Sequence, residues 1–486
     1  MRDRALLLIV VTVAIAACRQ PAAVETSKIQ RVENGLLPAI SVRGAAASPP
    51  MTLADRMAYY QVPGVSIAVI NNGEIEWARG YGVAAAHEKR PVTTGTLFQA
   101  ASISKPVTAL AALRLVQEGT LSLDENVNVK LKSWRVPDNT FTARQKVTLR
   151  MLLGHSAGFN VEDVGSYAAG ESLPTLVQAL DGVPPAHSPP IRVEAEPGKA
   201  FRYSGGGYSV IQQLLMDVTG KSFADLMQDL VLGRLGMTSS TFRQPLPAER
   251  AAEAATGHDV HGEPLPGRWH IFPQAAAAGL WTTPSDLARF AIGIERSFNG
   301  KSDAVLSMAT TKEMLTPGLA GYGLGWWVGS TGGRTSVSHP GQNEGFLCML
   351  FAYVDTRQGA VVMTNGDRGN GLFNEILRAI AREYGWPDYR QREKIVVAGN
   401  AAAYRSFLGE YEVNGLLMTI SQTGQDLFVQ APPIWPQPLK LFPAGDDRFF
   451  LVDEDVDLSF AKDTQGRVVE MRALAGGQNV VAKKVR

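Results

Sequence analysis

A serine and a lysine near residue 100 are spaced so that they could act together on a substrate. Ser102 and Lys105 stand three residues apart at the start of a predicted helix over residues 105–118, and residues three apart lie on the same face of a helix. The lysine could accept the hydroxyl proton, which would make the serine a nucleophile. Because this spacing also occurs by chance, with the serine merely capping a helix, the interpretation needs further groups.

Two later segments carry such groups. Tyr203 lies in a glycine-rich loop before a predicted helix at residues 208–218, and a tyrosine beside an amine could act as a phenolate or a proton relay. Otherwise it would be a packed turn residue. His339 and Gly341 lie between two strand-like segments, where backbone N–H groups could stabilise an oxyanion. In isolation, His339 could equally be an ordinary loop histidine.

The elements that must position these segments indicate an α+β fold. An Asn-Gly turn between residues 65–70 and 75–81 predicts a hairpin. Short strands return in residues 323–364, so that one sheet is built from both ends of a domain, with a helical lobe at residues 120–260 between them. Further helices are expected at residues 147–153, 287–294 and 371–384. No G-x-G-x-x-G motif opens a helix after a strand, which argues against a dinucleotide-binding fold.

After Trp386 the pattern changes to short strands separated by turns. Strands are expected at residues 417–420, 426–429, 448–452, 456–460 and 467–473. They predict a small antiparallel barrel or sandwich of roughly 85 residues that could be an independent unit. We therefore place a main domain at residues 51–390 and a C-terminal all-β domain at residues 400–486.

The N-terminal residues are expected to direct the chain rather than to join the fold. Residues 5–17 form an apolar run, too short to span a bilayer, that ends at Cys18. Small residues before a cysteine resemble the lipobox of bacterial lipoproteins, which implies a signal peptide over residues 1–18 and acylation of Cys18. The alternative is an ordinary signal peptide with a coincidental cysteine. Residues 19–50 are expected to be a tether. Cys348, in an apolar run, is expected to be a core residue without a disulfide partner.

Composition excludes several classes of protein. The chain has 486 residues and 47 basic against 46 acidic side chains, giving a net charge of +1. Such a balance argues against a nucleic-acid binder, which needs a basic excess to neutralise phosphates. The seven histidines show neither H-x-x-x-H nor H-E-x-x-H spacing, so we expect no metal site and no cofactor.

In this order, Ser102-Ile-Ser-Lys105, Tyr203-Ser-Gly205 and His339-Pro-Gly341 resemble the motifs of the serine β-lactamase and penicillin-binding-protein family. They are most similar to its class C-like branch, which also contains esterases, D-stereospecific aminopeptidases and D-alanyl carboxypeptidases. Supporting resemblances lie at residues 147–158, 231–240 and 278–286. The resemblance covers about residues 53–384. It implies a β-lactamase-like antiparallel sheet flanked by helices, and the C-terminal segment resembles the lipocalin-like tail of some members.

The resemblance also implies residue roles. Ser102 would be the nucleophile, Lys105 its base or proton shuttle, and Tyr203 the tyrosine of the second motif. The backbone N–H groups of Ser102 and Gln342, the residue after Gly341, would form the oxyanion hole.

Two departures from the family's motifs affect specificity. Gly205 stands where the family has an asparagine that binds the substrate's acyl amide. His339 stands where it has a lysine that pairs with the substrate's carboxylate, and Pro340 replaces a threonine. Since a histidine is only partly charged near neutral pH, we expect carboxylate-bearing substrates to bind better as the pH falls through about 6.5. Ester or peptide substrates are then favoured over β-lactams.

These observations predict a serine hydrolase that cleaves an ester, amide or peptide bond through an acyl-enzyme on Ser102. One alternative is a class C-like β-lactamase. Another is a penicillin-binding sensor that is acylated without efficient turnover. A third is that the C-terminal domain is the main functional unit and binds lipid or glycan. The expected partners are a small-molecule or peptide substrate and, through a lipid on Cys18, the membrane of a bacterial cell envelope on its periplasmic side.

Overall fold

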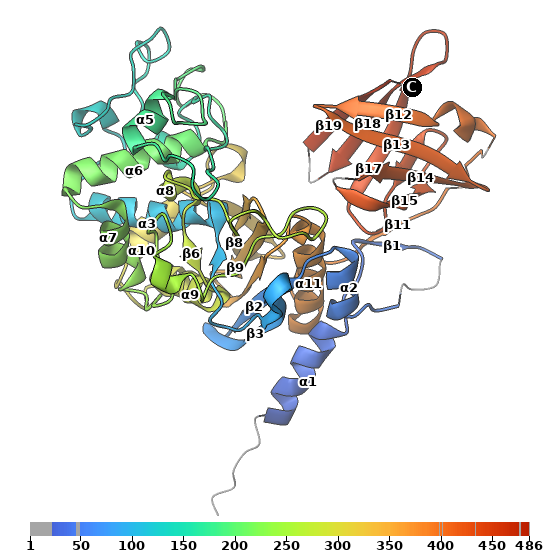
Figure 1. The fold of residues 1–486 in the computed structure, drawn as a ribbon, viewed down its shortest axis with the longest axis horizontal. Coiled ribbons are helices and arrows are strands. Elements are labelled where there is room, and N and C mark those ends of the chain that lie inside the picture. Colours follow the sequence, from blue (N-terminus) through green and yellow to red (C-terminus); the bar gives the residue numbers. More distant parts are fainter. Residues whose placement is uncertain are drawn as a thin grey trace, which may run out of the picture.

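A seven-stranded antiparallel sheet forms the centre of the first domain (Figure 1). The structure is a computed structural model, which describes residues 22–44, 49–397, 399–400, 402–432, 434–475 and 478–485. The strand order is β4-β3-β2-β10-β9-β8-β7. Their bounds are β2 Gly64–Asn71, β3 Glu74–Ala85, β4 Arg90–Pro91, β7 Trp327–Thr331, β8 Arg334–Asn343, β9 Phe346–Tyr353 and β10 Gln358–Thr364. Because β10 pairs with β2, the two ends of the domain meet in one sheet, as the sequence predicted.

The expected hairpin is present in β2 and β3. Asn72 and Gly73 between them both have positive φ, of 54° and 75°, which is the backbone of a type I′ turn and suits the twist of the two strands. Seven of the eight residues of β2 are buried, because the sheet is covered on both faces.

Each face of the sheet packs against its own set of helices. Val65, Ile67 and Val69 join a core with α2 (Leu53–Tyr59) and α11 (Gly369–Tyr384). Ala68 and Ile70, which alternate with them, join a larger core with the helices of the lobe. The other α-helices of this domain are α3 Ser104–Gln117, α4 Leu149–Leu153, α5 Leu176–Asp181, α6 Gly205–Thr219, α7 Phe223–Met227, α8 Ala275–Ala278, α9 Pro284–Phe298 and α10 Met308–Met314.

The expected tether is wrong for the described part of residues 19–50. Helix α1 (Ala22–Glu33) packs on α11 with Ile29 and Val32 buried. Strand β1 (Ile40–Val42) pairs in parallel with β11 (Arg392–Lys394). The segment is ordered because Ile29, Val32 and Leu36 bury their side chains in the core formed with α2 and α11. Cys18 and the rest of the predicted signal peptide lie outside the described residues. None of the helices in the described part of the chain is long and apolar enough to cross a membrane.

The C-terminal domain is a closed eight-stranded barrel, which confirms the all-β prediction (Figure 1). Its strands are β12 Gly409–Val413, β13 Leu416–Thr423, β14 Asp426–Ala431, β15 Trp435–Pro443, β16 Arg448–Phe450, β17 Val456–Lys462, β18 Val468–Ala475 and β19 Gln478–Lys484. Aromatic side chains pack inside it, with the rings of Phe407 and Phe460 stacked at 4.4 Å. An eight-stranded barrel is just wide enough for side chains to fill.

Candidate active site

Ser102 lies in a single 3-10 turn, Ala101–Ile103, immediately before α3. The residue before it, Ala101, has a φ of +48°, a left-handed conformation that strains any residue with a Cβ and is often kept at functional sites. The turn is held by the rest of the domain, because Ala100 N–H donates to the carbonyl of Leu280 at 2.8 Å.

Lys105 reaches back to this serine from the first turn of α3. Its Nζ lies 2.8 Å from Ser102 Oγ and 3.0 Å from the carbonyl oxygen of Ala277. The side chain is only 3% exposed, and this burial lowers the pKa of Lys105 to about 7, although the charge of Asp163 opposes the shift. A large fraction of the amine is therefore neutral near pH 7 and can accept the serine proton.

Tyr203 completes this group, just before Ser204, the N-cap of α6. Its ring centroid is 4.9 Å from Lys105 Nζ. Burial raises the pKa of Tyr203 above its usual value, and a hydrogen bond with Ser102 opposes this only in part. Tyr203 therefore remains a protonated phenol, suited to relaying a proton rather than to acting as a phenolate. The structure thus brings together Ser102, Lys105 and Tyr203.

His339 has a different environment from the one that the sequence predicts. Its imidazole is fully buried, with Nδ1 2.6 Å from the carbonyl oxygen of Pro340 and Nε2 3.0 Å from the hydroxyl of Tyr322. Burial, helped by the charge of Lys105, lowers the pKa of His339 to about 3. The expectation that this histidine gains charge near pH 6.5 is therefore wrong, because the packing of β8 removes the ring from water.

The binding of a substrate with a free carboxylate should consequently show no pH dependence that stems from His339. The KM of an anionic ester should have no inflection near pH 6.5 that is absent for a neutral ester, since the imidazole stays neutral well below that value. Comparing the two KM values between about pH 5.5 and 8, in the wild type and in His339→Gln, checks this. An inflection confined to the anionic ester and lost in His339→Gln would contradict it.

Gly341 and Gln342 lie on β8 beside the serine. A Cβ at Gly341 would stand 2.3 Å from the carbonyl oxygen of Ala100 and 2.5 Å from Cys348 Sγ, so only glycine allows β8 to approach the turn that carries Ser102. The pairing of β7 with β8 ends at Ser338, so the next residues of β8 lie along the edge that meets this turn. This placement fits the predicted oxyanion role of the Gln342 N–H. Cys348 is buried and free, as expected of a core residue.

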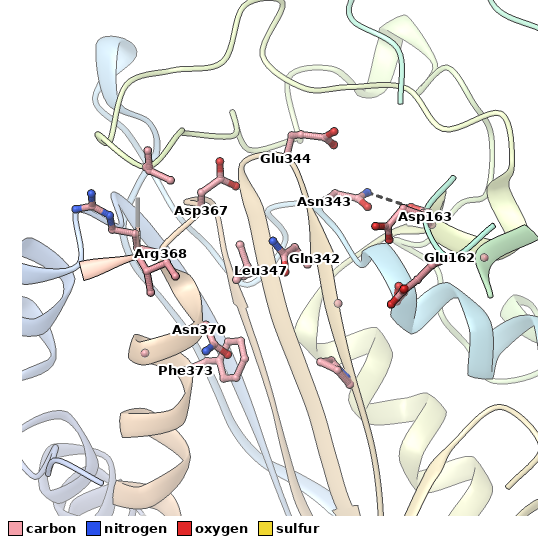
Figure 2. A pocket seen from close by; sticks show the side chains of 18 of the residues that line it. Glu162, Asp163, Gln342, Asn343, Glu344, Leu347, Asp367, Arg368, Asn370 and Phe373 are labelled. Carbon is pink, nitrogen blue, oxygen red and sulfur yellow. Dashed lines mark hydrogen bonds between the residues drawn. The ribbon is translucent and has the colours of Figure 1, made fainter. Parts of the chain in front are cut away.

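A cavity of about 800 Å³ opens over Ser102 and Lys105. Its wall includes Pro340, Gly341 and Gln342, and acidic side chains outnumber basic ones in it (Figure 2). They are Glu162, Asp163, Glu344, Asp367 and Glu454. Figure 2 shows Glu162 and Asp163 on one side of the cavity and Asp367 with Arg368 on the other. Within the described ranges, no His, Cys, Asp and Glu side chains are grouped so that three or more could hold a metal ion.

The loop that carries Glu162 and Asp163 also explains the glycine of the second motif. A Cβ at Gly205 would lie 2.7 Å from the carbonyl oxygen of Glu162 and 3.0 Å from a methyl carbon of Val164. The loop therefore fills the space that a side chain at residue 205 would need. Sequence reasoning did not find these acidic residues, because no spacing links them to Ser102.

His155 is a further residue whose function the sequence did not indicate, although its segment carried a resemblance. Its carbonyl oxygen accepts the N–H of Arg202 at 2.7 Å and its Nδ1 accepts the N–H of Ser204 at 3.1 Å. The ring also packs on Tyr203, with centroids 4.2 Å apart. Burial holds the pKa of His155 well below its usual value, so Nδ1 stays an acceptor. His155 thus clamps the backbone on both sides of Tyr203.

Loss of this clamp should slow the chemical step rather than weaken binding. His155 has a φ of +54°, which glycine and asparagine both tolerate. We expect His155→Gly to lower kcat about 10–100-fold with little change in KM, because small displacements of catalytic groups are costly. His155→Asn, which keeps a hydrogen-bond acceptor, should recover part of the rate. Equal kcat in the two variants, or a change confined to KM, would contradict a positioning role.

Comparison with known proteins identifies the family. Residues 52–384 match the family described as Beta-lactamase. Penicillin-binding protein 4* of Bacillus subtilis is 26% identical over 421 residues, which are 81% of this chain and 89% of that protein. The octameric penicillin-binding protein homologue from Pyrococcus abyssi has a similar fold, with a TM-score of 0.61 at 21% identity over 89% of this chain and 97% of its own. D-amino acid amidase from Ochrobactrum anthropi gives a TM-score of 0.56 at 22% identity, over 74% and 99%.

The family match spans more than half of the chain and includes Ser102, Lys105, Tyr203 and His339. The chain therefore belongs to the beta-lactamase family, and it is a serine hydrolase.

Proposed function

We propose that the protein cleaves an ester or amide bond through an acyl-enzyme on Ser102. The observation that carries the proposal is the 2.8 Å contact between Ser102 Oγ and a buried Lys105 whose pKa is about 7. In the first half-reaction, Ser102 Oγ attacks the carbonyl carbon as Lys105 takes its proton, and the N–H groups of Ser102 and Gln342 stabilise the oxyanion. Tyr203 then relays a proton to the leaving group. In the second half-reaction, water attacks the acyl carbon and gives its proton to Lys105. The bond to Ser102 Oγ then breaks, the acid product leaves, and the proton returns to Ser102 Oγ.

The surroundings of the serine favour substrates without a free carboxylate. The side chain at the expected carboxylate-binding position, His339, is neutral and buried. The cavity wall carries several carboxylates, and its arginine, Arg368, already donates to Gln61 and to the carbonyl of Pro432. Repulsion between like charges disfavours anionic substrates in such a site. The relatives named above include a D-amino acid amidase, whose reaction class agrees with this preference.

β-Lactam hydrolysis or slow acylation by penicillins is the second candidate, and the name of the Bacillus subtilis relative supports it. A panel of p-nitrophenyl esters, D-amino-acid amides and nitrocefin separates the two. We expect turnover of neutral esters or amides, lost in Ser102→Ala, to exceed that of nitrocefin. Nitrocefin turnover that exceeds that of every ester and amide would instead favour the β-lactamase.

We also propose that the protein is a lipoprotein of the bacterial cell envelope, anchored through Cys18. The small residues before Cys18 support this proposal. Cys18→Ser should move the protein from the detergent phase to the aqueous phase in Triton X-114 partitioning, and unchanged partitioning would contradict the anchor.

A further inference from the structure

The cavity over Ser102 is not closed by the first domain alone. Ile434 and Glu454, both from the C-terminal barrel, line the same cavity as Ser102 and Lys105. At about 800 Å³, this cavity is near the upper end of the usual range for small-molecule sites, roughly 300–1,000 Å³. Ser102 and Lys105 line only part of it.

The turn that carries Ile434 is fixed to the first domain. It joins β14 to β15 and is closed by the Ile434 N–H, which donates to the carbonyl of Ala431 at 2.8 Å. The carbonyl of Pro432 accepts Arg368 Nη2 at 2.9 Å, and Arg368 Nη1 donates to Gln61 Oε1 at 2.6 Å. Because Arg368 is the N-cap of α11, the turn is held against the helix that borders the cavity.

The segment before Glu454 is held by the N-terminal segment of the chain, which itself packs on the first domain through α1 and α11. Ile40 N–H donates to the carbonyl of Val452 at 3.0 Å, and Ala39 N–H to that of Asp453 at 3.4 Å. Phe450 is fully buried against Ala39 and Ile40. The two barrel segments that line the cavity are therefore both fixed in position by hydrogen bonds to other parts of the chain.

The chemistry of this wall is partly apolar. Ile434 is 48% exposed, although it lines a cavity that also includes Tyr60, Leu347 and Phe373. A lone apolar side chain on an outer surface needs no explanation. An apolar side chain that lines a catalytic cavity together with other apolar groups provides a surface against which an apolar part of the substrate can be buried.

We propose that the barrel forms the far wall of the substrate site, with Ile434 contacting an apolar group distant from the scissile bond. The inference rests on the proposed acyl hydrolysis at Ser102. It assigns the substrate to esters or amides with an extended apolar portion. A carboxylate placed at residue 434 would have to lose water when such a group binds, which costs free energy. A substrate too short to reach the barrel would not be affected.

Short and long esters test this wall directly. We compare kcat/KM for p-nitrophenyl acetate, p-nitrophenyl octanoate and octyl acetate, since the apolar group could lie on either side of the bond. Ile434→Asp should lower kcat/KM for at least one long ester about 10-fold, while p-nitrophenyl acetate changes less than about 2-fold. Leu474→Asp is the matched control, because Leu474 is a barrel residue of similar exposure, 43% against 48%, that does not line this cavity, and it should change kcat/KM for none of the three esters.

Failure of the barrel-wall proposal can be distinguished from failure of the proposed hydrolysis at Ser102. If Ser102-dependent hydrolysis is present but Ile434→Asp changes the short and long esters equally, or changes none, the barrel wall is overturned and the proposed function stands. If no ester is hydrolysed, labelling by fluorophosphonates with short and long alkyl chains provides the same comparison of wild type and Ile434→Asp. Absence of any labelling at Ser102 would overturn both proposals.

Discussion

Replacing Ser102 with alanine should reduce kcat for every ester or amide substrate by about 10⁴-fold or more, because the substitution removes the oxygen that carries the acyl group. The expectation depends on the geometry at the start of α3, where Ser102 Oγ is the hydroxyl within 2.8 Å of Lys105 Nζ. Substrate binding should be retained, since the cavity wall is unchanged. Steady-state kinetics of Ser102→Ala with the best substrate of the panel measure the loss.

Ser104 provides the matched control. It lies two residues away, but its Oγ is buried and accepts the N–H of Leu280 at 3.0 Å. Ser104→Ala leaves that N–H unpaired, which should destabilise the fold by about 1–3 kcal/mol while kcat changes little. A kcat loss in Ser104→Ala as large as in Ser102→Ala, in a protein that is still folded, would contradict the assignment of Ser102 as the nucleophile.

Lys105 and Tyr203 should behave as one proton-transfer unit. Lys105→Met and Tyr203→Phe should each lower kcat by about 10²–10⁴-fold, the range for general acid–base groups. Because both serve the same proton transfer, the double variant should lose little more than the worse single one. Kinetics of the four proteins give the result, and losses that multiply in the double variant would show that the two side chains act in separate steps.

The pH profile reports on the same unit. Burial lowers the pKa of Lys105 to about 7, so the side chain is an ammonium below that pH and a free amine above it. Since the amine is the base, kcat/KM should rise as the pH increases through about 7 and then level off. In Lys105→Arg the guanidinium stays protonated at every pH studied and cannot accept the serine proton, so this variant should be inactive throughout the pH range. A wild-type rate that falls through pH 7 would contradict a lysine base.

The local parts of the site could be predicted from the sequence, and the parts that depend on packing could not. Ser102 and Lys105 are three residues apart on one turn, so spacing alone brings them together. His339 has the residue type expected of a partly charged group, but its neutral state follows from burial against Tyr322, which no spacing reveals.

The same distinction applies to the fold. The hairpin at Asn72-Gly73 and the all-β C-terminal domain have local turn and alternation patterns, and both were predicted. Residues 19–50 were expected to form a tether because they are rich in Ala, Pro, Ser and polar residues with weak periodicity, yet α1 packs on α11 and β1 pairs with β11. Ile434 is more than 300 residues from Ser102 along the chain, so only the fold could place both in one cavity.

Covalent labelling tests the central claim most directly. The intact protein, treated with a fluorophosphonate, should gain one adduct, and peptide mapping by mass spectrometry should place it on Ser102. Labelling should become faster as the pH rises through about 7, in step with the pKa of Lys105, and should be absent in Ser102→Ala. An adduct on Ser104, Ser156 or Ser204, or undiminished labelling of Ser102→Ala, would contradict the assignment of Ser102 as the nucleophile.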